Sequence, residues 1–238
     1  MTRLLQITAL WIAFLGNAHA DSLSLPPNLT AASSLQGEAF LLDAQSREAY
    51  LKLSDQFLTQ KTQTFCGVAS MVMVFNAMNL PAPETLEYAP YRIFTQDNIF
   101  DAKTEAILPR DTILKQGITL DQMGALVALK PVNVTIRHAA GSSIDQFRKE
   151  ASSYLAQKGH FVLVNYLRDS LGQKAGGHFS PLAAYEPKSD RFLILDVARY
   201  KYPPVWVTAS ELFAAMNTQD PDNQNKTRGY VLISRKDY

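Results

Sequence analysis

The order of the secondary-structure signals is the feature that most limits the fold of this chain. Helical spacing of Leu, Phe and Tyr covers 35–58, and a strongly apolar helix is predicted over 66–78. Runs rich in Val, Ile, Leu and Phe, which are typical of strands, come later, at 160–167, 178–185, 191–198 and 229–234. Because no βαβ alternation links them, we expect an α+β protein built around an antiparallel sheet.

Capping residues predict three more helices. Thr119 with Gln122, Ser143 with Gln146 and Thr208 with Glu211 have the spacing of residues that close a helix N-terminus. The helices are expected over 123–129, over 147–157 and between the last two strands. The segment 80–110 has no clean period and is predicted to be a long connection with one short helix.

Composition and the N-terminus suggest an exported globular protein. A chain of 238 residues with 47% hydrophobic side chains can bury a real core, and a net charge of +1 gives no field that would attract nucleic acid. A basic start, an apolar stretch over 4–16 and Ala18-His19-Ala20 predict a signal peptide at 1–20. We expect 21–238 to be a single catalytic domain in the periplasm or outside a bacterial cell, with no membrane association.

The only cysteine of the chain, Cys66, is the candidate nucleophile. It has no disulfide partner and opens the apolar helix, where backbone N–H groups and the helix dipole favour a thiolate. The competing interpretation is a small buried hydrophobe. Gln60, six residues upstream, could point its amide at a developing oxyanion, and Gln63 is the weaker candidate for that role. A solvated loop glutamine is the alternative for both.

Among the histidines, His178 is the best candidate base. His138 and His160 sit in ordinary strand or surface contexts, whereas Gly176 and Gly177 leave open backbone before His178. The segments 178–185 and 191–198 are predicted to form an antiparallel hairpin in which paired residue numbers sum to about 376.

That hairpin brings a carboxylate to the histidine. In the predicted register Asp196 faces Ser180 and shares a face with His178, so Asp196 can orient the imidazole while the ring serves Cys66. Motifs for zinc, for a serine nucleophile and for phosphate binding are absent from the sequence. We therefore expect no tightly bound cofactor and no dedicated metal site.

Three segments resemble the phytochelatin synthase family. They are 65–70 (FCGVAS), 176–181 (GGHFSP) and 194–207 (ILDVARYKYPPVWV), and the likeness extends over 57–234. The resemblance implies a papain-like fold, with Cys66, His178 and Asp196 as nucleophile, base and orienting residue. It also implies that Gln60 serves the oxyanion hole and that Asn165, Gly177, Arg228 and either Asp220 or Asp222 line a γ-glutamyl pocket.

The same resemblance implies the substrate. Such enzymes cleave the cysteine–glycine bond of glutathione, release glycine and hold γ-glutamylcysteine as a thioester, which passes to a second glutathione or to water. This chain is similar to the short bacterial form, in which hydrolysis outruns polymer formation. Heavy-metal ions such as Cd²⁺ or Zn²⁺ would then enter as thiolate complexes of glutathione, and a homodimer is consistent with the family.

Two other functions fit the sequence less well. An exported papain-like peptidase would share the same three residues but would act on peptides and ignore glutathione. A thiol-dependent metal-binding protein is the non-catalytic alternative, although soft-metal sites usually need several thiolates and this chain has one.

Overall fold

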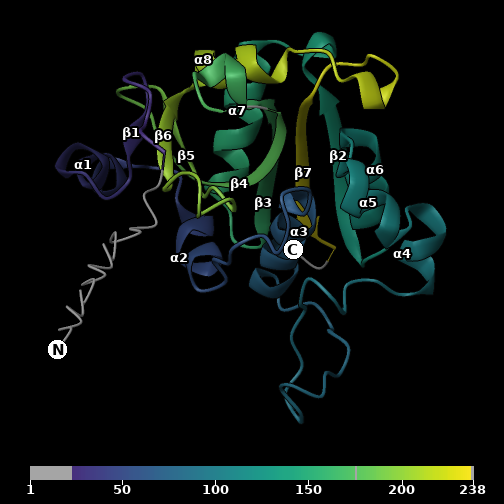
Figure 1. The fold of residues 1–238 in the computed structure, drawn as a ribbon. Coiled ribbons are helices and arrows are strands. Elements are labelled where there is room, and N and C mark those ends of the chain that lie inside the picture. Colours follow the sequence, from purple (N-terminus) through teal and green to yellow (C-terminus); the bar gives the residue numbers. More distant parts are fainter. Residues whose placement is uncertain (1–22, 175, 237–238) are drawn as a thin grey trace, which may run out of the picture.

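The computed structural model describes residues 23–174 and 176–236 (Figure 1). Within them, seven strands form one antiparallel sheet in the order β1-β6-β5-β4-β3-β7-β2. The expected α+β class around an antiparallel sheet is confirmed. The strands are β1 (Thr30–Ala31), β2 (Val132–His138), β3 (His160–Leu167), β4 (Gly177–Glu186), β5 (Arg191–Ile194), β6 (Val205–Thr208) and β7 (Gly229–Arg235).

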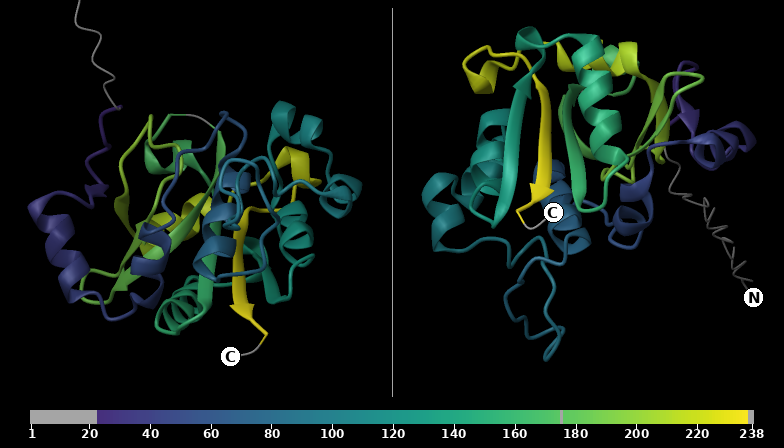
Figure 2. Two further views of the ribbon diagram at one scale, coloured as in Figure 1. Left: turned by 90° about the horizontal axis from the view of Figure 1, so that it is seen from below. Right: turned by 180° about the vertical axis from the view of Figure 1, so that it is seen from behind.

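Helices cover both faces of the sheet. α2 and α3 pack against β4 on the face toward the viewer in Figure 1, with α6 beside them on β2 and β7, whereas α7 packs on β3 and β4 from behind (Figure 2). The helices are α1 (Leu35–Asp43), α2 (Glu48–Ser54), α3 (Cys66–Ala77), α4 (Ala102–Ile107), α5 (Arg110–Gln116), α6 (Leu120–Val127), α7 (Ile144–Leu155) and α8 (Ala209–Met216), with 3₁₀ turns η1 (Ala139–Gly141), η2 (Arg168–Leu171) and η3 (Pro221–Asn223).

The predicted capping residues begin their helices. Thr119 caps α6 in a reciprocal capping box with Gln122, and the hydroxyls of Ser143 and Thr208 accept backbone N–H groups at the starts of α7 and α8. Each cap satisfies a donor that has no acceptor inside its helix, which fixes where the helix starts. The long connection predicted over 80–110 contains one short helix, α4, as expected.

Two predicted elements are wrong in extent. The helical spacing over 35–58 is divided into α1 and α2, because the backbone at Ser46 leaves the helix to bridge Tyr185, whose N–H donates to the Ser46 carbonyl at 2.8 Å. The strand predicted over 191–198 ends at Ile194. Beyond that point Leu195 still donates to the Pro181 carbonyl, but a proline has no N–H with which to return the bond.

The hairpin register is confirmed at the end that matters for the site. Leu182 pairs with Ile194, which gives the predicted sum of 376, and a bulge between Leu182 and Ala184 shifts the remaining pairs by one residue. The bulge therefore lies on the turn side, and the strand ends near His178 keep the expected alignment.

Helix α3 is the buried axis of the molecule. Every residue of α3 except Asn76 is buried. The Asn76 side chain exchanges two hydrogen bonds of 2.9 Å with the backbone of Phe94, which ties the long connection to the helix. Helix α3 also packs against β4, which places its first residue, Cys66, at the sheet. The signal peptide expected at 1–20 lies outside the described residues and stays a prediction.

Candidate active site

Cys66 is the first residue of α3, and its side chain is almost buried, with 7% of the residue exposed. Burial raises the pKa of the Cys66 thiol, but the hydrogen bond and the charge of His178, together with the backbone N–H groups of Phe179 and Gly67, lower it further than burial raises it. The net pKa of the thiol is below its ordinary value, as expected for a sulfur held by donors at a helix start. The side chain therefore favours the thiolate.

His178 lies at the start of β4 and contacts both predicted partners. Its Nε2 is 2.9 Å from Asp196 Oδ1, and the ring also hydrogen-bonds the Cys66 thiol. Burial lowers the pKa of His178, but the negative charge and hydrogen bond of Asp196 raise it above the ordinary value. The ring of Tyr166 packs edge-on against the imidazole with centroids 5.6 Å apart, which limits its rotation.

Asp196 lies just beyond β5 and is fully buried. Burial raises the pKa of its carboxyl, but the charge and hydrogen bond of His178 and the charge of Arg168 lower it to about 2. The Ala198 N–H also donates to Oδ1 at 2.8 Å. The carboxylate is therefore ionised and held on several sides, as an orienting residue requires.

Two further groups surround this carboxylate and its histidine, and the sequence did not single out either for these roles. The Arg168 guanidinium, 2% exposed, lies 2.8 Å from the Asp196 carboxylate and donates to Gln173 Oε1 at 2.7 Å. The Ser180 hydroxyl, also buried, is 3.0 Å from His178 Nε2. The available signal was indirect: Arg168 follows directly after a buried strand, where an unpaired charge would be costly.

Gln60 is buried and lies beside the segment that follows Asp196. Its backbone N–H donates to the Val197 carbonyl at 2.9 Å, and its side-chain Nε2 donates to the Thr62 carbonyl and to the Tyr200 hydroxyl, both at 2.8 Å. Its Oε1 has no hydrogen-bond partner within the described residues. Gln60 thus lies close to Asp196 along the chain segment that follows it, and both N–H groups of its side-chain amide donate hydrogen bonds within the protein.

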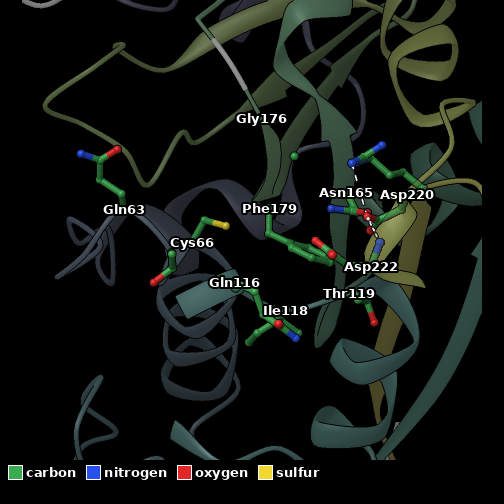
Figure 3. Close-up of a pocket in the computed structure, with 14 residues that line it drawn as sticks. Gln63, Cys66, Gln116, Ile118, Thr119, Asn165, Gly176, Phe179, Asp220 and Asp222 are labelled. Atoms are coloured by element: carbon green, nitrogen blue, oxygen red, sulfur yellow. Dashed lines mark hydrogen bonds and ion pairs between the residues drawn. The ribbon is translucent and has the colours of Figure 1, made fainter. Parts of the chain in front are cut away.

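A cavity of about 250 Å³ opens beside Cys66 (Figure 3). It is formed where β3, β4 and β7 lie side by side, because Asn165 pairs with Phe179 on one side and with Gly229 on the other. The cavity brings together the predicted pocket residues: its lining includes Gln63, Cys66, Asn165, Gly177, Asp220, Asp222 and Arg228.

The wall of the cavity opposite Cys66 is charged and polar. Arg228 and Asp220 are both nearly buried, and Arg228 Nη2 lies 3.5 Å from Asp220 Oδ1, whereas Asp222 is exposed. Arg228 Nε and Asn165 Oδ1 have no partner within the described residues. A donor and an acceptor left unpaired at a cavity wall are suited to a ligand that carries both an ammonium and a carboxylate group.

The other two described histidines do not contact Cys66. His138 Nε2 lies 2.7 Å from Asp121 Oδ1 and its Nδ1 faces the Thr227 carbonyl, while His160 Nδ1 lies 3.0 Å from the Lys158 carbonyl. Among residues 23–174 and 176–236, we find no group of three or more His, Cys, Asp or Glu side chains placed to hold a metal ion. In the same ranges, no helix has the length and apolar character needed to cross a bilayer.

The geometry defines a class of protein: a buried cysteine at a helix start, an imidazole and a carboxylate in the order used by enzymes with a cysteine nucleophile. The comparison with known families narrows that class. The family model for phytochelatin synthase matches residues 20–230, and the chain belongs to the phytochelatin synthase family.

Curated relatives agree with this assignment. A glutathione gamma-glutamylcysteinyltransferase 1 of Lotus japonicus is 37% identical over 216 residues, which is 90% of this chain and 42% of the relative. The protein of that name in Arabidopsis thaliana is 31% identical over 93% of this chain and 44% of its own length, and the Schizosaccharomyces pombe transferase is 30% identical over 84% and 47%. The chain thus spans less than half the length of these relatives.

Proposed function

We propose that this chain is a glutathione γ-glutamylcysteinyltransferase in which hydrolysis of glutathione to γ-glutamylcysteine is the main outcome. The observation that carries the proposal is the hydrogen-bonded series Cys66, His178 and Asp196 beside a cavity with an ion pair at its far wall. The names of the matching relatives support the same substrate.

Acylation begins with the Cys66 thiolate. The sulfur adds to the carbonyl carbon of the cysteine–glycine bond of glutathione, and the carbonyl oxygen becomes an oxyanion beside the first N–H groups of α3, which have no acceptor inside the helix. His178, protonated and steered by Asp196, gives its proton to the glycine nitrogen. The C–N bond breaks, glycine leaves, and γ-glutamylcysteine remains as a thioester on Cys66.

Deacylation uses the same imidazole as a base. Neutral His178 takes a proton from water, the hydroxide equivalent attacks the thioester carbonyl, and γ-glutamylcysteine and the Cys66 thiolate are restored. When the amine of a second glutathione attacks instead, the acyl group is transferred and the chain of γ-glutamylcysteine units grows by one. Cd²⁺ or Zn²⁺ would enter this reaction as thiolate complexes of glutathione, and thus as substrate.

The cavity suits the γ-glutamyl end of the donor. Arg228 can pair with the α-carboxylate, while Asp220 and the free Oδ1 of Asn165 can accept from the α-ammonium group. We assign this role to Asp220 over Asp222, because Asp220 is nearly buried and paired with Arg228, whereas Asp222 is exposed. Gly177 lines the cavity, and the absence of a side chain there lets the Arg228 guanidinium approach β4, because a Cβ would lie 3.1 Å from Arg228 Nε.

The test is a product analysis. Purified protein and its Cys66→Ala variant are incubated with glutathione, with and without Cd²⁺, and glycine, γ-glutamylcysteine and longer oligomers are quantified. We expect mainly glycine and γ-glutamylcysteine from the wild type, with any excess of glycine matched by longer oligomers, and none of these products from the variant. Absence of glycine from the wild type would refute the proposal, and cleavage of an unfolded protein substrate in its place would favour the papain-like peptidase.

We further propose that the protein is exported, with cleavage after Ala20. The support is the sequence of residues 1–20, which combines a basic start, an apolar stretch and a small-residue site. Expression in a bacterial host, followed by fractionation and intact-mass analysis, should give a periplasmic species that begins at Asp21. A full-length cytoplasmic product would contradict the export proposal and would leave the proposed reaction unaffected.

A further inference from the structure

The cavity of the candidate active site lies between two walls that are held in different ways. One wall is the segment 116–119, which leads directly into α6. Helix α6 packs tightly on both of its neighbours. A Cβ on Gly124 of α6 would lie 2.1 Å from a side chain of β2, and a Cβ on Gly67 of α3 would lie 2.9 Å from Met123 Cε of α6. The start of α6 is therefore fixed against both the helix of the nucleophile and the sheet.

The other wall is the loop 219–228 between α8 and β7, which supplies the Asp220 and Arg228 side chains of the cavity. Its only regular structure is the short 3₁₀ turn η3. Gln224 and Asn225 have φ angles of 56° and 60°, in the left-handed region that residues with a side chain rarely adopt. The conformation of this loop therefore depends on contacts that hold it from outside.

The carboxylate of Asp121, the second residue of α6, connects the two walls. Asp121 Oδ2 lies 2.7 Å from Lys226 Nζ, and Asp121 Oδ1 lies 2.7 Å from His138 Nε2. The other ring nitrogen of His138 faces the Thr227 carbonyl. Because both ring nitrogens face oxygen atoms, the imidazole satisfies both only when each nitrogen carries a proton and the ring is charged. One carboxylate thus holds two consecutive residues of the loop, directly before Arg228.

The charges at this corner favour the same arrangement. Burial raises the pKa of Asp121, but the hydrogen bonds and charges of Lys226 and His138 lower it below its ordinary value. The carboxylate is therefore ionised at neutral pH and lies between two cations. The N–H of Ala139, next to His138, donates to the Arg228 carbonyl at 2.9 Å. The backbone of Arg228 is thereby attached to the same corner of the molecule as Asp121.

We propose that Asp121 is a positioning residue that determines how well the cavity recognises the γ-glutamyl head of the donor. Through Lys226 and His138, its carboxylate holds the loop against α6. That contact fixes where the Arg228 guanidinium and the Asp220 carboxylate lie. A donor that carries both an ammonium and a carboxylate group is recognised at both ends only while these two side chains keep their places. The inference deepens the proposed function and rests on it for the identity of the donor.

The experiment compares Asp121→Asn with Asp145→Asn. Asp145 is the second residue of α7 and pairs with Arg148 of its own helix, so its substitution removes the same interaction with a helix dipole but leaves the loop untouched. The side chains joined by Asp121 are 25% to 48% exposed, so the fold should survive either change. We expect Asp121→Asn to raise KM for glutathione about fivefold with kcat for glycine release little changed, and Asp145→Asn to match wild type. Asp121→Glu, which keeps the charge, should recover part of the loss.

Two further readouts separate this role from general damage. The p-nitrophenol burst with p-nitrophenyl acetate, an ester without a γ-glutamyl head, should be unchanged in Asp121→Asn. The preference for glutathione over N-acetylglutathione, which lacks the ammonium group, should fall, as measured by the ratio of their kcat/KM values. A KM for glutathione in Asp121→Asn equal to that in Asp145→Asn would overturn the proposal. An ester burst that slows as much as glycine release would also overturn it, because the damage would then lie at Cys66.

Hydrogen exchange of the loop tests the contact without any substrate. Backbone N–H groups within 219–228 should exchange faster in Asp121→Asn than in Asp145→Asn, as followed by mass spectrometry of the peptides that cover the loop. If the wild type acylates with the ester but ignores glutathione, the proposed substrate fails. The exchange rates still decide whether Asp121 holds the loop, and equal rates in the two variants would overturn that role.

Discussion

Asp196 is shared between two cations, and this sharing governs the chemistry at the scale of single residues. His178 Nε2 lies 2.9 Å from the Asp196 carboxylate, and the Arg168 guanidinium lies 2.8 Å from the same carboxylate. The positive charge of Arg168 opposes protonation of His178, and Asp196 favours it. The pKa of His178, and with it the pH range in which an imidazolium partners the thiolate, is therefore set by two buried charges of opposite sign. Removing one of them should move the pH range of reactivity in a defined direction.

The first prediction concerns Asp196→Asn. In the wild type the thiolate forms as pH rises through the lowered pKa of Cys66, and the imidazolium persists until pH passes the raised pKa of His178. Loss of the carboxylate lowers the pKa of His178 and weakens its hold on the thiolate, so the acid limb should move up and the alkaline limb down. The pH profile of iodoacetamide alkylation, which needs only the thiolate, measures the acid limb. The pH profile of glycine release, which also needs the imidazolium as proton donor, measures the alkaline limb. Asp169→Asn is the control, because Asp169 directly follows Arg168 in the sequence but its side chain is exposed. A pH profile of Asp196→Asn that matches the wild-type profile would contradict this prediction.

The second prediction concerns Ser180. Its hydroxyl lies 3.0 Å from His178 Nε2 and accepts the Val197 N–H at 3.4 Å. Ser180→Ala should cost about 1 kcal/mol of positioning, or roughly a fivefold fall in kcat for glycine release with KM little changed. Ser70→Ala is a matched control, because Ser70 is equally buried on α3 but its hydroxyl has no partner in the described chain. Equal kcat values for the two variants would remove Ser180 from the site.

The central residues of the site were predictable because each carried a local signal. Cys66 opens an apolar helix, His178 follows two glycines, and Asp196 falls on the same face of the predicted hairpin. Arg168 carried no such signal as a functional residue. Its role depends on the contact that η2 makes with Asp196, and that contact joins residues 28 positions apart in the chain.

At the scale of elements, local chemistry predicted some parts and tertiary contacts decided others. The capped helices and the apolar strands β3, β4 and β7 lie where their patterns indicated. Strand β2 was missed although 132–138 alternates partly apolar and polar residues, and β6 has only four residues after two prolines. The two residues of β1 pair with β6 from far away in the sequence, so no local pattern could have specified them.

The third prediction concerns the loop between α8 and β7. Asp220 accepts the Asp222 N–H at 3.3 Å and pairs with Arg228, whereas the Asp222 carboxylate is exposed at the cavity. We expect Asp220→Asn to raise KM for glutathione about tenfold, since a charged hydrogen bond contributes about 1.5–3 kcal/mol, and Asp222→Asn to change it less than twofold. Initial rates of glycine release measure both. A larger effect from Asp222→Asn would reverse the assignment of the pocket carboxylate.

At the scale of the whole molecule, the sheet has no space for a side chain at Gly229, the first residue of β7, which directly follows the cavity residue Arg228. A Cβ on Gly229 would lie 1.9 Å from the Arg137 carbonyl oxygen, across the pairing of β7 with β2. Gly229→Ala should therefore lower the free energy of unfolding by about 3 kcal/mol, as overpacking of backbone does. Gly141→Ala, where a Cβ would meet nothing within 4 Å, should change it by less than about 0.5 kcal/mol.

Urea unfolding followed by circular dichroism measures this fourth prediction, with the denaturant slope compared between variants. A midpoint for Gly229→Ala equal to that of Gly141→Ala would mean that β2 can withdraw without cost. Such an outcome would also predict a mobile Arg228, which precedes Gly229 directly. The homodimer expected from the family resemblance stays a prediction at this scale, and sedimentation equilibrium of the purified protein tests it.

The nucleophile and its base lie on opposite sides of the interface between α3 and β4, because Cys66 belongs to the helix and His178 to the strand. Any fluctuation that separates α3 from β4 removes the imidazole from the sulfur. The thiol then regains its proton and its ordinary, low reactivity. Oxidants attack thiolates and spare thiols. Cys66 is thus reactive only while α3 and β4 are packed together, and when they separate the protonated thiol is protected from oxidation.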